Sequence, residues 1–163
     1  MSLIFKSNWL KPMTKNIILF LVINFAALGI GSFLMGDGPN SNYYQSINKA
    51  PWTPPGWVFG AAWTTIMVCF SIYMAYWIKA DNTNTVLALF ALQFMLNVGW
   101  NPLFFHFHLS LPALLVIIAL TVVVGYFLFS NWSLLGPKSL LIAPYFIWLG
   151  IATSLNWYIL VKN

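Results

Sequence analysis

The sequence predicts an all-α integral membrane protein built as a bundle of five transmembrane helices. Of its 163 residues, 61% are hydrophobic and only 6% are charged, and the mean hydropathy is +0.82. Soluble domains carry about a quarter of charged residues, so this composition excludes a soluble fold. Apolar runs follow one another along the chain and leave no room for a separate soluble domain. We therefore expect one membrane domain over residues 1–163.

Each apolar run is long enough to cross a bilayer. A hydrocarbon core about 30 Å thick requires about 20 apolar residues in a helix. Breaker residues such as Gly, Pro, Asn and Asp separate the runs. Only the first connection, residues 36–55, is long enough to form structure of its own. The predicted spans are residues 15–35, 56–78, 85–105, 111–129 and 139–161.

The first run is expected to be a retained helix and not a signal peptide. It is longer than the apolar part of a signal peptide and lacks an obvious small-residue cleavage site. The run is preceded or begun by three lysines, Lys6, Lys11 and Lys15. The predicted topology places Lys79 and Lys138 on the same side of the membrane as these three. Because positive charge favours the cytoplasmic side, we expect a cytoplasmic N-terminus and an outward-facing first loop.

The second run begins with a rigid segment that is rich in tryptophan. Pro51, Pro54 and Pro55 fix φ and remove backbone donors, so the segment before Gly56 cannot be the middle of a helix. The helix is expected to begin at Gly56. Several indole rings are thereby held at a defined place near the membrane surface.

The third run carries polar and aromatic residues at helical spacing. Gln93, Asn97, Trp100, Asn101 and Phe104 fall at i, i+4, i+7, i+8 and i+11, which places them on one face of a helix. Polar groups in the bilayer core are costly unless they have partners. This face is therefore expected to line the bundle interior or a cavity.

The fourth run, residues 111–129, begins at the breaker residues Ser110 and Pro112 and ends before the polar segment that starts at Asn131. The fifth run shows a further mixed face. With the helices alternating in direction, the mixed faces of spans two, three and five fall largely in the half of the membrane next to the first loop. The mixed faces of spans two and five consist of Phe59, Trp63, Ile66 and Phe70, and of Tyr145, Trp148, Ala152 and Asn156.

Two interpretations of these faces remain open at this point. Interfacial aromatic belts and interhelical amide hydrogen bonds are ordinary features of membrane packing, and they account for Trp52, Trp57 and Tyr158. They account less well for Trp63 and Trp148, which lie well inside their spans. The alternative is a mostly apolar pocket with a few amides and indoles, which suits a flat hydrophobic ligand with polar edges.

Several other chemistries are disfavoured. The acids Asp37 and Asp81 both lie in connections, which argues against an ion-coupled transporter and against hydrolysis by paired carboxylates. His106 and His108 point apart at i, i+2 and have no Cys or carboxylate nearby in sequence, so no metal site is expected. Cys69 is expected to be a small buried hydrophobe. The chain has no arginine and its lysines are scattered, which favours anionic lipids over nucleic acid as the counterpart of its +5 charge.

The chain resembles the TspO/MBR family, the bacterial relatives of the mitochondrial translocator protein or peripheral benzodiazepine receptor. Three separate motifs carry the resemblance in the same order and spacing. They are Tyr43-Tyr44 with residues 49–55 (KAPWTPP) and Trp63; Gln93, Asn97, Trp100 and Phe104-Phe105; and residues 144–148 (PYFIW) with residues 152–156 (ATSLN).

The resemblance implies a five-helix bundle, commonly dimeric, whose pocket beneath the first loop binds porphyrins such as protoporphyrin IX and haem-related tetrapyrroles. It also implies that Trp63 and Trp148 are the two pocket tryptophans to which light-dependent porphyrin degradation is attributed in some members. Residues 155–162 fit a loose pattern for cholesterol contact, but Lys162 stands where animal members have Arg, which argues against sterol binding. The predicted ligand-binding residues are Tyr44, Trp52, Pro54, Phe59, Trp63, Gln93, Asn97, Trp100, Phe104, Tyr145, Trp148 and Ala152.

Three functions follow as hypotheses. The first is a membrane protein, expected in a bacterial cell membrane, that binds a porphyrin or another flat hydrophobic ligand for sensing, sequestration or transport and requires no cofactor. The second is light-dependent oxidative degradation of the bound porphyrin, with Trp63 and Trp148 as the catalytic residues. The third is a non-catalytic membrane scaffold. No acid, base or nucleophile constellation supports conventional catalysis.

Overall fold

The computed structural model describes residues 2–163, with side chains from Met13 onward, and these residues form helices and turns without a strand. The elements are α1 (Ser2–Leu34), η1 (Gly38–Asn40), α2 (Asn42–Ser46), α3 (Gly56–Ala80), α4 (Asn84–Asn101), η2 (Pro102–His106), α5 (Ser110–Ser130), α6 (Trp132–Leu135), η3 (Gly136–Ile142) and α7 (Ala143–Lys162).

The predicted five-helix membrane bundle is confirmed. Five segments are long and apolar enough to cross a bilayer, and large apolar side chains such as Phe33 and Val22 lie exposed on their outer faces. Such exposure is expected where lipid, not water, surrounds the protein. The five segments are Met13–Asn40, Gly56–Ala80, Asn84–His106, Ser110–Ser130 and Trp132–Lys162.

The helix boundaries differ from the prediction at three places, one of which is the third span, where α4 ends at Asn101 and the π-helix η2 continues from Pro102 to His106. α1 begins at Ser2 instead of residue 15. The prediction used the length of the apolar run, which gives the part of a helix that crosses the bilayer, and the helix itself continues beyond that part. The last span begins with the 3₁₀ helix η3, and its α-helix starts at Ala143 instead of residue 139. Gly136 has a φ of 57° and Pro137 follows it, which turns the chain and delays the α-helix.

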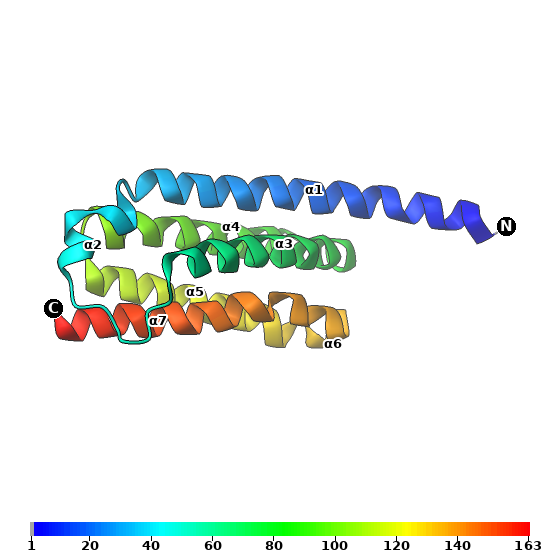
Figure 1. The fold of residues 1–163 in the computed structure, drawn as a ribbon. Coiled ribbons are helices and arrows are strands. Elements are labelled where there is room, and N and C mark those ends of the chain that lie inside the picture. Colours follow the sequence, from blue (N-terminus) through cyan, green and yellow to red (C-terminus); the bar gives the residue numbers. More distant parts are fainter. Residues whose placement is uncertain (1) are drawn as a thin grey trace.

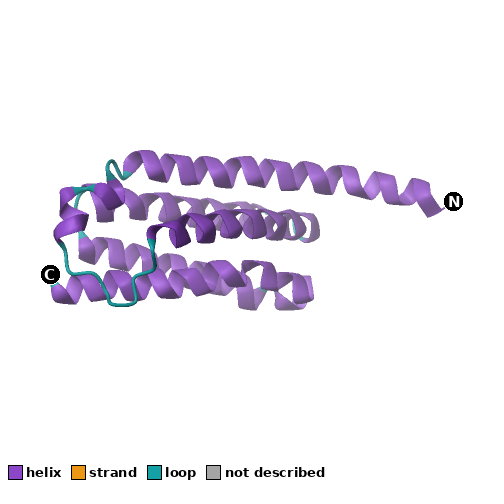
Figure 2. Ribbon diagram, viewed as in Figure 1, coloured by secondary structure: helices purple, strands orange, loops and turns teal. Residues whose placement is uncertain are grey.

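The helices lie side by side, with α1 packed along α3 and α4, and α5 packed along α4 and α7 (Figure 1). The N-terminal part of α1 extends beyond the other helices at one end of the bundle. At the opposite end lie α2, the loop that leads into α3, and the end of α7 (Figures 1 and 2). We call this the first-loop end, and we call residues 36–55 the lid.

The half of the bundle away from the first-loop end is filled by a cluster that we call the aromatic core, made of Phe70, Tyr73, Trp77 and Phe127. Their side chains are buried, and their rings contact one another at centroid distances of 4.9 to 6.5 Å. The Tyr73 hydroxyl donates to the Phe127 carbonyl at 2.9 Å and accepts from the Asn131 amide at 2.6 Å. This half of the bundle is therefore closely packed.

Candidate ligand-binding pocket

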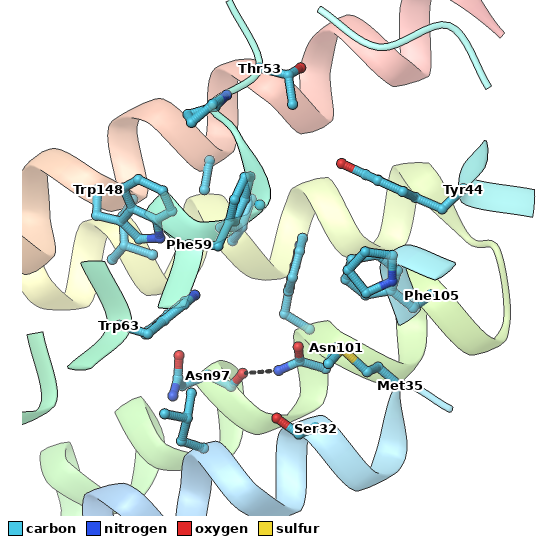
Figure 3. Close-up of a pocket in the computed structure, with 18 of the residues that line it drawn as sticks. Ser32, Met35, Tyr44, Thr53, Phe59, Trp63, Asn97, Asn101, Phe105 and Trp148 are labelled. Carbon is cyan, nitrogen blue, oxygen red and sulfur yellow. Dashed lines mark hydrogen bonds between the residues drawn. The ribbon is translucent and has the colours of Figure 1, made fainter. Parts of the chain in front are cut away.

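A cavity of about 460 Å³ lies in the half of the bundle next to the first loop. α1, α3, α4, α5 and α7 form its walls, and the lid covers it. Most of the predicted ligand-binding residues line it, and Figure 3 shows Trp63 and Trp148 on one side with Tyr44 and Phe105 on the other. The predicted residues that line the cavity are Tyr44, Pro54, Phe59, Trp63, Asn97, Trp100, Trp148 and Ala152.

Trp52 and Phe104 lie outside the cavity. The Trp52 side chain is 54% exposed, and its indole nitrogen donates to the Ser154 hydroxyl at 3.2 Å while its ring packs edge-on against Tyr158. Phe104 is buried behind the cavity and stacks on Trp100 at a centroid distance of 5.2 Å. Trp52 thus holds the lid to α7, and Phe104 supports a wall.

Gln93 and Tyr145 lie beneath the cavity floor. Both are buried, and the Gln93 amide nitrogen donates to the Tyr145 hydroxyl at 2.8 Å. The Gln93 side-chain oxygen has no hydrogen-bond partner among the described residues. The Tyr145 ring contacts Trp63 edge-on at 5.9 Å, so this pair supports a residue that does line the cavity.

Trp63 on α3 and Trp148 on α7 present their rings to the cavity from two helices (Figure 3). Phe59 packs edge-on against Trp148 at a centroid distance of 5.2 Å and fixes the orientation of that ring. Within the described part of the chain, neither indole N–H donates a hydrogen bond to another residue. Both therefore remain as donors for a bound molecule.

The cavity floor carries two amides from α4. The Asn101 side-chain nitrogen donates to the Asn97 carbonyl at 3.2 Å (Figure 3). The Asn97 side chain is only 7% exposed, it lines the cavity, and no described residue bonds to its amide. Since buried polar groups normally have partners, the Asn97 amide is suited to bind a ligand.

Asn101 lies against α1 where that helix has no side chain. A Cβ built on Gly31 would lie 2.7 Å from the Asn101 amide nitrogen, which is closer than real Cβ contacts. Glycine at position 31 therefore lets Asn101 occupy this place between α1 and the cavity.

The mouth of the cavity lies beneath the lid, where Tyr44 and Lys49 line it. The Lys49 ammonium group is 4.9 Å from the centre of the Tyr44 ring, which is within cation–π distance. Burial raises the pKa of the Tyr44 hydroxyl above its usual value. The Tyr44 hydroxyl is therefore a neutral hydrogen-bonding group at physiological pH.

The lid is fastened to the end of α7 by paired amides. The Asn48 backbone nitrogen donates to the Asn163 side-chain oxygen at 2.8 Å, and the Asn163 side-chain nitrogen donates to the Asn48 carbonyl at 3.3 Å. A third hydrogen bond runs from the Asn48 side-chain nitrogen to the Lys162 carbonyl at 3.3 Å.

Several lining residues were missed in the sequence prediction of the binding set. Asn101 lies on the polar face predicted for the third span, and Lys49 lies within a recognised motif, so both residues carried a usable signal. Ile117 and Leu120 are apolar residues in the apolar helix α5, and nothing in the sequence distinguishes them from their neighbours. The lining residues outside the predicted set include Ser32, Gln45, Lys49, Asn101, Phe105, Ile117 and Leu120.

The histidines do not form part of the cavity wall. His108 has a φ of 57° and stacks on Tyr43 at a centroid distance of 3.9 Å, and His106 packs edge-on against Phe107. Within the described residues no three His, Cys, Asp or Glu side chains come together as metal ligands would.

The arrangement of the cavity is suited to bind a flat, mostly apolar molecule.

Comparison with known proteins gives a consistent result. The TspO/MBR family profile matches residues 18–162. The "Tryptophan-rich protein TspO" of Chlorobaculum tepidum is 32% identical over 84% of this chain and 89% of its own length. The "Tryptophan-rich sensory protein" of Cereibacter sphaeroides is 30% identical over 85% of both chains. The "Translocator protein" of Bos taurus is 30% identical over 78% of this chain and 80% of its own length.

Proposed function

Because the chain belongs to the TspO/MBR family and is a multi-pass membrane protein, we propose that it binds porphyrins or related tetrapyrroles in the cavity beneath the lid. The observation that carries the proposal is the set of aromatic rings around one cavity. Trp63, Trp100 and Trp148 line it from three different helices. Flat faces and unused donors at the cavity wall suit a conjugated macrocycle with polar atoms at its centre and edge.

The size and lining of the cavity agree with this proposal. A volume of about 460 Å³ falls within the range of about 300 to 1,000 Å³ that is usual for small-molecule pockets. Phe59, Phe105 and Leu149 supply further apolar surface, and Asn97 supplies the amide. No step of this binding requires a cofactor.

The physiological role that we propose is sensing, sequestration or transport of the bound tetrapyrrole. The name of the Cereibacter sphaeroides relative, "Tryptophan-rich sensory protein", supports the first of these. We further propose an N-terminus on the cytoplasmic side and a lid on the opposite side, since the lysines favour that topology. A homodimer within the bilayer is compatible with the broad apolar outer faces.

A direct test is a titration of protoporphyrin IX into the purified protein in neutral detergent in the dark. The porphyrin's own absorption and fluorescence anisotropy should be followed, because tryptophan substitutions change the intrinsic fluorescence. Saturable binding that is weakened about tenfold by Trp148→Ala is expected, since the substitution removes a large buried aromatic side chain from the wall.

The matched control for this titration is Trp157→Ala on the same helix. The Trp157 side chain is 58% exposed and does not line the cavity, so its loss should leave the affinity unchanged. Non-saturable uptake that is equal in all three proteins would indicate partitioning into detergent. That result would refute porphyrin binding and favour the scaffold hypothesis.

A specific observation favours photo-oxidation as a second candidate function. Trp63 and Trp148 face the same cavity with unused N–H groups, so a porphyrin bound there would touch both rings. An illuminated porphyrin transfers energy to dissolved oxygen, and the oxygen species formed oxidises the nearest electron-rich groups. The porphyrin and the indole rings of the cavity wall, among them Trp63 and Trp148, are the closest such groups in this site.

The proposed topology has its own test. In a Cys69→Ser background, a cysteine introduced at Asp37 should react with an impermeant maleimide on intact cells, and one introduced at Asp81 should not. The two aspartates lie in connections at opposite ends of the bundle. The reverse labelling pattern would invert the topology.

A further inference from the structure

The cavity beneath the lid has one charged group in its lining. Among the residues that form its wall, Lys49 carries a positive charge and none carries a negative charge. The acids of the chain, Asp37 and Asp81, are not part of the wall, and the described residues give Lys49 no carboxylate partner. The mouth of the cavity therefore holds a cation that no group in the described part of the chain neutralises.

The deep part of the cavity offers a different kind of partner. There the Asn97 amide and the indole N–H groups of Trp63 and Trp148 are neutral donors without protein partners in the described chain. A carboxylate buried among neutral groups loses its hydration without gaining an opposite charge, which is costly. A neutral hydrogen-bonding or apolar edge therefore costs less to bury in this deep part than a carboxylate, which meets an opposite charge only at Lys49.

The backbone on both sides of Lys49 is held in place. Asn48, which precedes Lys49 in the chain, is hydrogen-bonded to Asn163, and Trp52, which follows it, is hydrogen-bonded to Ser154. The lid is therefore anchored to the C-terminal part of the chain on both sides of the lysine. The Tyr44 ring contacts the ammonium group itself. An ammonium group that is positioned before the ligand arrives loses less entropy when it binds.

From these observations we propose that the cavity binds a carboxylate-bearing ligand in one orientation. The carboxylate edge lies at the mouth against Lys49, and the uncharged edge lies inward between Trp63 and Trp148. This inference rests on the proposed function and narrows it to anionic tetrapyrroles, such as porphyrins with free propionates. Esterified or neutral porphyrins of the same shape should bind less well.

The test compares two ligands that differ in charge and not in ring shape, protoporphyrin IX and its dimethyl ester, titrated in the dark in neutral detergent. The unmodified protein should bind the acid about tenfold more tightly than the ester, as expected for a charged contact at a half-buried site. Lys49→Met should abolish this preference by weakening the acid alone, and Lys49→Arg should keep it. Added salt should weaken the acid more than the ester.

Two further variants separate this charge effect from other causes. Lys162→Met removes one positive charge at the same end of the bundle but outside the cavity, and it should leave the preference intact. Asn97→Leu acts at the deep part of the cavity and should weaken acid and ester by the same factor. Equal loss of preference in Lys49→Met and Lys162→Met would mean that general surface charge is responsible, and it would overturn the proposal.

The remaining outcomes also decide between the two proposals. Equal affinity of the unmodified protein for acid and ester would overturn the orientation while leaving porphyrin binding intact. A Lys49→Met protein that binds both ligands less well by the same factor would assign the lysine to the structure of the lid. Failure of either ligand to bind saturably would refute porphyrin binding itself, and the orientation with it.

Discussion

The Trp100 indole nitrogen donates a hydrogen bond to the Asn156 side-chain oxygen across 3.1 Å. Asn156 in turn donates to the Ser110 carbonyl at 3.0 Å, so one amide joins α4, α7 and the start of α5. The N–H of Trp100 is thereby occupied, and this residue offers only its ring to the cavity. In this respect it differs from Trp63 and Trp148, whose N–H groups remain unused in the described chain.

Replacing Asn156 should therefore lower stability more than an ordinary polar substitution does. Asn156→Ala leaves the Trp100 N–H and the Ser110 carbonyl without their partner, which costs about 1 to 2 kcal/mol. Thermal unfolding in detergent should show the lower transition temperature. Asn82→Ala, in the exposed connection before α4, should stay within about 0.5 kcal/mol of the unmodified protein. Equal melting of the two variants would contradict this role for Asn156.

Light-dependent loss of bound porphyrin should depend on the two unused indoles. Trp63→Phe combined with Trp148→Phe keeps aromatic rings at the cavity wall, so dark affinity should change by less than about fivefold. The rate of porphyrin bleaching under illumination should fall to that of free porphyrin in detergent. Absorption spectra recorded against time of illumination measure the rate.

Trp157→Phe, at an exposed position of the same helix as Trp148, serves as the control for the illumination experiment. It should bleach porphyrin at the rate of the unmodified protein. If the double variant also bleached at that rate, the catalytic assignment of Trp63 and Trp148 would be wrong, and photo-oxidation would need no particular residue.

Gly31 and Gly29 form a matched pair on α1. Gly31→Ala forces the Asn101 side chain away from its present place and should destabilise the protein by about 1 kcal/mol and weaken ligand binding. Gly29→Ala meets no atom within 4 Å and should be neutral or slightly stabilising, because alanine favours a helix over glycine. Thermal unfolding and porphyrin titration of both variants check this difference. Equal effects would show that the approach of Gly31 to Asn101 is unimportant.

The Asn48 and Asn163 amides should control the opening of the lid. Asn48→Ala together with Asn163→Ala removes exposed hydrogen bonds worth about 0.5 to 1 kcal/mol, so amide exchange in residues 47–53 should accelerate about two- to fivefold. Porphyrin should associate and dissociate faster, with little change in affinity. Asn42→Ala, elsewhere in the lid and without a side-chain bond between described residues, is the control. Unchanged exchange in the double variant would show that the lid is held by other contacts.

Much of the architecture could be predicted because it follows from apolar length and helical spacing. The depth of the cavity could not be predicted in this way. Gln93 and Asn97 share one face of α4, yet only Asn97 reaches the cavity, since the Tyr145 side chain fills the space beside Gln93. Spacing along one helix predicts which residues share a face of that helix. Whether such a residue reaches the cavity depends on the side chains of the neighbouring helix.

The path of the lid was equally hidden from sequence reasoning. Trp52 belongs to a tryptophan-rich motif, but its ring turns outward to Ser154 and Tyr158, residues about a hundred positions away along the chain. Lys49 belongs to the same motif, and the contacts of its neighbours Asn48 with Asn163 and Trp52 with Ser154 hold it at the mouth of the cavity. Contacts between distant segments of this kind have no local sequence signal.

The aromatic core also has a consequence for how this molecule couples the two faces of the membrane. The cavity lies under the lid, and the buried rings of Phe70, Tyr73, Trp77 and Phe127 fill the bundle on the side away from the lid. In this conformation the site communicates with one compartment and the adjoining leaflet. A ligand bound in this conformation therefore exchanges with the lid side or the adjoining leaflet, and its passage to the opposite face would require Phe70, Trp77 and Phe127 to repack.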